Sequence, residues 1–445
     1  MESSDLKVTS LSLALPYDGV DHAGGQLLLH HHRVLLKHCV RLDVFSPDYD
    51  HNRPQTGRNF QLDDHHHPAI ISFPWWRKTL IGKVLARLWT LAMPVLPDLG
   101  ACIGFITSRR LRESIRNADV VELQWAEFFI FARLVHRLNP SATIIGYVHD
   151  VPSQRIERAV ATWRGPLRRV YLRYVTAQER QLVRGLHAAI VLSQKDADLL
   201  SARGVNFDVH VLNPPLKTRS DSVTAKPGPT RTSHTQAFGF VAAFHRPENN
   251  DAGLWLLNHI WPHVVDEVPA AHLYLVGSRP SKELRDAAEN IGESVEVTGY
   301  VDDIDSFYEH FDTVIIPLRY GAGVKIKTIS GILAQKNVIA TPIAIEGTLP
   351  DHFFYCVSDA PDVLADAMVN VARRPEGGRS IVAAALAEVG ARYSIEDYSD
   401  AMLAVYDVRR CHSQVDNGAP VRWRVSNSLR ITSPQVQASA ASAHE

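Results

Sequence analysis

Short apolar runs alternate along most of the chain with stretches in which apolar residues recur every three or four positions. Runs such as Thr143–Val148 and Val338–Ala340 are rich in β-branched residues and have the composition of buried strands. The stretches between such runs have the spacing of one-sided helices, for example Gln26–Lys37. Strands that alternate with helices predict α/β domains built on parallel sheets.

The length and composition predict two domains. The chain has 445 residues, of which 45% are hydrophobic and 21% are charged, which is enough for two ordinary globular domains. The segment 217–235 is rich in Ser, Thr, Pro and Lys and has little to bury, so it is predicted to lie in an interdomain linker. We expect an N-terminal domain over 1–212, a linker with a flexible insertion over 213–235, a C-terminal domain over 236–392, a C-terminal helix over 393–411 that crosses back to the first domain, and a disordered tail over 412–445.

Charge and cysteine usage narrow the class of protein. A formal net charge of −1 gives no general attraction to nucleic acid, so no nucleic-acid partner is expected. The four cysteines lie far apart without a CxxC pair, which favours reduced thiols in a cytoplasmic protein. The N-terminus lacks a signal-peptide core, and no uncharged apolar run approaches the ~20 residues of a membrane span.

The stretch Thr313–Pro350 is predicted to form a strand, a glycine loop, a helix, a second strand and a turn. Gly321 and Gly323 fall between the first strand and the helix, where glycine lets the backbone approach a ligand closely. The helix start offers free N–H groups to an anion, and Lys325 and Lys327 add positive charge there. The pattern is neither a dinucleotide fingerprint nor a P-loop, so these residues alone leave a diphosphate site and a plain βαβ turn both open.

The longer pattern resembles the nucleotide-sugar site of the glycosyltransferase group 1 family, also called family 4. The residues that carry the resemblance are Pro317-Leu318, Gly321–Lys327, Val338–Pro342 and Glu346-Gly347. The resemblance implies the GT-B architecture, in which two Rossmann-like domains with parallel sheets face each other across a cleft. It also implies transfer of a sugar, with retention, from a nucleoside-diphosphate sugar to a glycan or lipid-linked saccharide, with no cofactor and no metal.

The resemblance places candidate residues in both halves of the chain. His149, at the end of a predicted strand, would point toward the donor sugar, with a satisfied structural histidine as the alternative. Arg246 and Lys327 are candidate catalytic cations that would stabilise the leaving diphosphate. A glycine pair at the first strand–helix turn would face the donor phosphates, although a turn without a ligand is equally open. The full set of predicted donor-binding residues is Gly24, Gly25, Gly321, Gly323, Val324, Lys325, Thr328 and Ser330.

The sequence departs from the family where two glutamates eight residues apart are usual. Ala322 and Ser330 occupy these positions. Serine offers the donor ribose only an uncharged hydrogen bond, which is about half as strong as a charge-assisted one. A non-catalytic GT-B protein that binds or regulates a partner transferase is therefore the alternative function. A nucleotide-sugar epimerase would need a set of acid–base carboxylates, which the sequence does not supply.

Two further features bear on partners. His30–His32, in a predicted helix, and His65–His67, in a predicted polar loop, lack the i, i+4 pairing with an acid that marks a zinc site, so no metal is expected. Residues 75–97 contain three tryptophans and four basic residues, no acidic residue, and an apolar helical face. Such a segment either contacts an anionic membrane surface, here the inner face of the membrane, or packs in the core.

Overall fold

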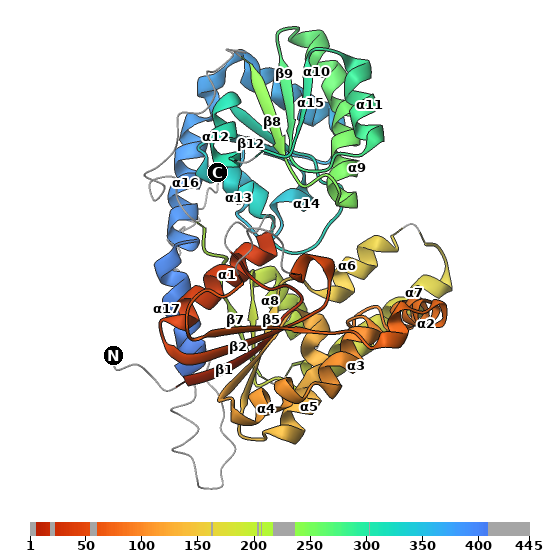
Figure 1. Cartoon of the computed structure of the whole chain (residues 1–445). Helices are drawn as coiled ribbons and strands as arrows, with labels where there is room; N and C mark the ends of the chain where they lie inside the picture. Colours follow the sequence, from red (N-terminus) through yellow and green to blue (C-terminus); the bar gives the residue numbers. More distant parts are fainter. Residues whose placement is uncertain are drawn as a thin grey trace, which may run out of the picture. The chain divides into compact units, whose positions relative to one another are not determined.

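The strands of the protein form two sheets, and the strands within each sheet run parallel. The computed structural model describes residues 6–17, 23–53, 60–161, 163–202, 204–205, 207–216, 236–301 and 303–407. The insertion predicted after residue 216 and the tail predicted over 412–445 lie outside these residues. The predicted α/β class with two Rossmann-like sheets is confirmed (Figure 1).

The first sheet has the strand order β3-β2-β1-β4-β5-β6-β7. Its strands are β1 (Leu6–Leu11), β2 (Cys39–Pro47), β3 (His66–Ile71), β4 (Val120–Gln124), β5 (Thr143–Val148), β6 (Ala188–Val191) and β7 (Asp208–Val211). The accompanying helices are α1 (Ala23–Leu36), α2 (Leu80–Ala92), α3 (Leu99–Thr107), α4 (Arg109–Asn117), α5 (Ala132–Leu138), α6 (Pro152–Ala159), α7 (Pro166–Val183) and α8 (Gln194–Ser201). The central strands β4 and β6 are buried at every residue, as expected for a parallel sheet covered on both faces.

The second sheet has the strand order β10-β9-β8-β11-β12-β13. Its strands are β8 (Ala237–Val241), β9 (His272–Val276), β10 (Val295–Gly299), β11 (Thr313–Ile316), β12 (Asn337–Ala340) and β13 (Cys356–Val357). The helices around it are α9 (Pro247–Trp255), α10 (Trp261–Glu267), α11 (Lys282–Ile291), α12 (Ile304–Phe307), α13 (Ile326–Leu333), α14 (Pro342–Ile345), α15 (Pro361–Arg373) and α16 (Arg379–Arg392).

In both sheets the sequence order of neighbouring strands reverses beside the first strand. The order reverses between β1 and β4 in one sheet and between β8 and β11 in the other. Ligands of open α/β sheets bind beyond the carboxyl ends of the strands at such a point. The loops after β1, β4, β8 and β11 are therefore the places where the topology favours a ligand.

The last described helix, α17 (Ile395–Asp407), packs on the first sheet. Tyr398, Met402 and Tyr406 are buried in one cluster with apolar residues of β1, β2 and α1. The chain thus returns to its N-terminal sheet, and Figure 1 shows α17 beside α1.

Two local predictions were wrong. Gly24 and Gly25 lie in the first turn of α1, not in a loop before it, because glycine is tolerated where the first helical N–H groups have no intrahelical partner. His66 and His67 lie in β3, not in a polar loop. Their pairing with Leu42 and Asp43 of β2 extends the sheet and buries His66 despite its polar side chain.

Candidate active site

The glycine loop between β11 and α13 lies against the end of β5. Gly321 and Gly323 have φ angles of 143° and 69°, in the region that favours glycine. A Cβ atom on Gly323 would lie 3.0 Å from the backbone oxygen of His149. Only glycine fits this approach without displacing a neighbour. The structure thus brings two predicted site residues, Gly323 and His149, together.

Lys325 immediately precedes α13 and is buried. Its Nζ donates to the backbone oxygen of Gly323 at 2.7 Å, which ties the lysine to the glycine loop. Burial lowers the pKa of Lys325 to about 8, although the charge of Glu346 acts to raise it. A phosphate near this lysine would favour its charged form.

Lys327, in the first turn of α13, reaches the first turn of α9. Its Nζ donates to Oδ1 of Asn249 and lies 5.5 Å from the centroid of the Phe240 ring. Burial lowers the pKa of Lys327 to about 7, and the nearby charge of Arg246 adds to the effect. Arg246 itself is exposed, and its Nε pairs with the carboxylate of Glu248 at 2.8 Å. The two predicted catalytic cations therefore lie at the same end of the second sheet.

Three other predicted residues of this segment have different surroundings. Thr328 is fully buried, and its hydroxyl donates to the backbone oxygen of Ala344 at 2.6 Å, so it holds α13 to α14. Val324 packs against the apolar clusters of both sheets. Ser330 is partly exposed on α13, and its hydroxyl has no hydrogen-bond partner among the residues that the structure describes.

His149 directly follows β5 and is oriented by its neighbours. Its ring stacks on Trp125, with the ring centroids 4.0 Å apart and the planes 15° apart. Trp125 has a φ of 68°, a conformation that is uncommon outside glycine and that often marks functional sites. The sequence around His149 does not indicate that its ring stacks on Trp125, because Trp125 follows a different strand, β4.

A chain of hydrogen bonds fixes the proton on the His149 ring. Burial acts to raise the pKa of Glu122, but His31, His32 and the Tyr406 hydroxyl together lower it to about 2, so the carboxylate is ionised and only accepts. It accepts from Nε2 of Gln124 at 3.3 Å, which leaves Oε1 of Gln124 facing Nε2 of His149 at 3.2 Å. His149 therefore carries a proton on Nε2.

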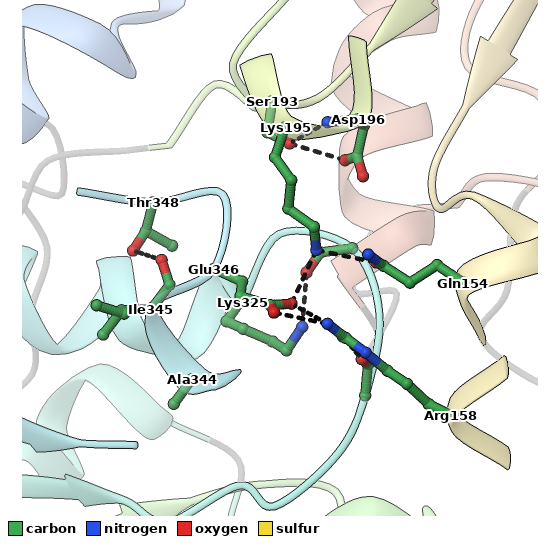
Figure 2. A network of polar contacts seen from close by, with 12 residues as sticks. Gln154, Arg158, Ser193, Lys195, Asp196, Lys325, Ala344, Ile345, Glu346 and Thr348 are labelled. Carbon is green, nitrogen blue, oxygen red and sulfur yellow. Dashed lines mark hydrogen bonds and ion pairs between the residues drawn. The ribbon is translucent and has the colours of Figure 1, made fainter. Parts of the chain in front are cut away.

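Three charged residues meet at the glycine loop (Figure 2). The sequence alone assigns none of them a role. Arg158 of α6 donates from Nη2 to both carboxylate oxygens of Glu346, at 2.6 and 2.7 Å, and from Nη1 to the backbone oxygen of Gly321. Lys195 of α8 donates from Nζ to Glu346 at 2.8 Å and to Gln154 at 2.9 Å. The sequence showed an arginine-rich segment over 151–184, but not which arginine reaches the loop.

Cationic side chains from segments that flank both sheets thus lie near the glycine loop and the start of α13. Arg158 and Lys195 come from the N-terminal sheet, and Lys325 and Lys327 come from the C-terminal sheet. Gly24 and Gly25 begin α1, and their contact with a donor stays a prediction. The arrangement can neutralise a diphosphate as its charge develops.

The C-terminal half of the chain matches a known family model. Residues 235–374 match the family model of the "Glycosyl transferases group 1". The resemblance to this family that was seen in the sequence is thus confirmed over this segment of the chain. A curated relative, the "Uncharacterized 44.6 kDa protein in cps region" of Klebsiella pneumoniae, is 29% identical over 149 residues. The aligned part spans 32% of this chain and 38% of that protein.

Solved structures show that the fold extends over nearly the whole chain. Sucrose-phosphate synthase from Thermosynechococcus elongatus matches with a TM-score of 0.65 at 14% identity, covering 91% of this chain and 100% of that one. HepE from Anabaena, solved in complex with UDP and glucose, matches with a TM-score of 0.59 at 12% identity over the same shares. These likenesses confirm the GT-B fold.

Proposed function

We propose that the protein is a retaining, metal-independent glycosyltransferase that uses a nucleoside-diphosphate sugar. The observation that carries the proposal is the placement of two lysines where the glycine loop leads into α13, with Lys325 bonded to the loop and Lys327 in the first turn of the helix. Departure of a nucleoside diphosphate leaves negative charge on its phosphates, and preorganised cations stabilise that charge where it develops.

Each part of the site has a role in this reaction. The free N–H groups at the start of α13 and the two lysines would bind the diphosphate. His149, with its proton on Nε2 and its ring held by Trp125, would contact the donor sugar. Attack by the acceptor hydroxyl on the face from which the diphosphate leaves would retain the anomeric configuration, with the donor phosphate taking the hydroxyl proton.

The donor and the acceptor are proposed by class. HepE was solved with UDP and glucose, which supports a nucleoside-diphosphate hexose as donor. The acceptor would be a glycan or a lipid-linked saccharide, as the family resemblance implies. Comparison of several donors would identify the base and the sugar.

Thermal unfolding with a panel of UDP-, GDP-, ADP- and TDP-sugars, with and without EDTA, tests the proposal. A ligand at about 100 times its Kd adds about 2.7 kcal/mol of stability, an easily measured shift. We expect one donor class to stabilise the protein regardless of EDTA, and Lys327→Ala to abolish the shift. Lys282→Ala, at an exposed lysine of α11, is the control and should keep it. A wild-type protein stabilised by no donor would contradict the proposal.

A non-catalytic regulator is the second candidate, because Ala322 and Ser330 replace the usual glutamates. Ser330 is partly exposed, so its hydroxyl can meet a ligand, but it carries no charge. Donor hydrolysis and transfer assays on the wild type and on Ser330→Glu separate the two functions. Donor binding without turnover in the wild type, together with turnover in Ser330→Glu, would favour the regulator.

We also propose that the segment 75–97 contacts a membrane surface. The apolar side chains that the sequence places on one face of α2 are exposed rather than packed in the core, with Leu80 at 79% and Leu88 at 57% exposure. Trp75, in the turn before α2, is 80% exposed. Among the described residues, every helix is too short or too polar to cross a membrane, so the contact would be peripheral.

The neighbouring helix α7 extends this surface. Tyr174 of α7 donates to the backbone oxygen of Ala92 at 2.6 Å, which places α7 beside the end of α2. Leu167 and Val170 of α7 are also exposed, at 77% and 62%. Basic residues accompany the apolar ones on both helices, namely Lys83, Arg87, Arg168, Arg169 and Arg173. A broad apolar surface with basic neighbours fits anionic lipid.

Vesicle flotation tests this contact. The protein should float with vesicles that contain anionic lipid and stay behind with purely zwitterionic ones. Leu80→Ser/Leu167→Ser should lose binding, whereas Val363→Ser, at an exposed apolar residue of α15, should retain it. Absence of binding to anionic vesicles, or dimers that bury the same leucines, would contradict the proposal.

A further inference from the structure

We propose that Arg158 and Lys195 bind the donor diphosphate, and that Glu346 holds them at the glycine loop as an internal anion that the diphosphate displaces. The inference rests on the proposed function and adds residues of the first sheet to the donor site. It starts from the contacts at Glu346, which join α6 and α8 to the turn after α14 (Figure 2).

The position of Arg158 carries the first step. One arm of its guanidinium donates to both oxygens of Glu346, while the other donates to the backbone oxygen of Gly321. The guanidinium therefore lies on the loop predicted to bind the diphosphate. Lys195 reaches the same carboxylate from α8. Guanidinium groups bind carboxylate and phosphate with the same paired donors, so a phosphate can take the place of the carboxylate.

The charge balance carries the second step. Arg158, Lys195 and Lys325 bring three positive charges, whereas Glu346 and Asp196 are the carboxylates that act on the pKa of Lys325. Asp196 contacts the Ser193 hydroxyl at 2.8 Å rather than one of these cations, so its charge acts on them only from a distance. Figure 2 shows the Lys325 side chain directed toward Glu346. The single negative charge of Glu346 must therefore balance all three cations. A diphosphate would supply the negative charge that the cluster lacks.

The three side chains of this ion-pair cluster are partly exposed, so a diphosphate can reach them and replace the carboxylate of Glu346. The side chains of Arg158, Lys195 and Glu346 are 20%, 27% and 23% exposed, so water can enter as the ion pairs separate. Glu346 ends α14 and precedes Gly347, which has a φ of 72°, so the carboxylate sits at a turn rather than within a rigid helix. A fully buried permanent ion pair would lack both features.

Calorimetric titration of the full-length protein with inorganic pyrophosphate, and separately with UDP, tests the inference. Glu346→Gln should tighten pyrophosphate binding by about three- to tenfold, because it removes a competing negative charge. Arg158→Gln should weaken binding, and the gain from Glu346→Gln should shrink in the Arg158→Gln background, since the two residues act on each other. Glu267→Gln breaks the ion pair with Arg373, 2.7 Å long, and is the matched control that should change nothing.

The outcomes separate this inference from the proposed function. Unchanged or weaker pyrophosphate binding by a folded Glu346→Gln variant would overturn the inference, even if the wild type transfers sugar. If Glu346→Gln does not fold, undiminished binding by Arg158→Gln and Lys195→Gln would overturn it instead. Pyrophosphate binding that tightens in Glu346→Gln, in a protein that binds no nucleotide and transfers no sugar, would support the anion exchange and reject the proposed function.

Discussion

At the scale of single residues, the site depends on lysines whose charge is incomplete before a ligand arrives. Lys327 is half-buried at the junction of α13 and α9, with Asn249 as its hydrogen-bond partner instead of a carboxylate. Burial brings its pKa to about 7 and that of Lys325 to about 8. An anionic ligand favours the protonated form of both, so ligand binding and proton uptake are linked.

We expect diphosphate binding to weaken as pH rises from 7 to 9. Below the free-state pKa each lysine is already protonated, whereas above it binding must first supply the proton, at a cost of up to about tenfold in affinity per pH unit for one group. Titration of UDP in buffers of different ionisation enthalpy would show net proton uptake. Lys327→Arg keeps its charge at these pH values and should reduce the uptake. Equal uptake by both proteins would contradict the assignment to Lys327.

At the scale of elements, α17 is attached to the first sheet by a buried polar network. The hydroxyl of Tyr406 donates to Glu122, which also pairs with His31 at 2.8 Å. Tyr398 bonds both His31 and Tyr147, at 2.9 Å each. Through Gln124 the same carboxylate fixes the proton of His149. The helix thus supports the site from behind the sheet.

Tyr406→Phe should lower the free energy of unfolding by about 1.5–3 kcal/mol, the range for a hydrogen bond to a charged group. Denaturant unfolding monitored by circular dichroism would measure it. Tyr393→Phe is the control, because the Tyr393 hydroxyl has no hydrogen-bond partner in the described part of the chain. A loss below about 0.5 kcal/mol for Tyr406→Phe would show that Glu122 does not need this donor.

At the scale of the whole molecule, the first sheet depends on α17, a helix that follows the second sheet in the sequence and packs back on the first. Tyr398, Met402, Val405 and Tyr406 are all at most 6% exposed within the apolar cluster of the first sheet. Removing α17 would expose this cluster, leave Glu122 without the Tyr406 hydroxyl and leave His31 without the Tyr398 hydroxyl. The N-terminal sheet is therefore not expected to be stable by itself.

A chain that ends at Ser394 should unfold at a markedly lower temperature than the full chain, or fail to stay soluble. A chain that ends at Asp407 retains α17 and lacks residues 408–445, most of which the sequence predicts to be a disordered tail, so its melting temperature should be unchanged. Differential scanning calorimetry of both proteins gives the comparison. Equal stability of the shorter chain would show that α17 is dispensable for the first sheet.

The sequence alone determined most of the elements and the family resemblance of the C-terminal half. The β-branched run Thr143–Val148 is β5 with the same bounds. Gly321, Gly323, Lys325 and Lys327 were recognisable because a strand–glycine–helix junction is local in sequence. The start of α1 and the strand β3 were missed, because glycine and histidine patterns do not report the pairing that surrounding strands impose.

Only the tertiary structure decided which charges meet at the glycine loop. Arg158 and Glu346 are 188 residues apart, and Lys195 and Glu346 are 151 residues apart. No local periodicity connects such positions, since they approach only after both sheets have formed and packed. The same holds for Trp125 on His149 and for Tyr406 on Glu122, where side chains from separate elements share one buried environment. Local patterns therefore specified the strands, helices and loop, and packing selected the partners that give the site its charge.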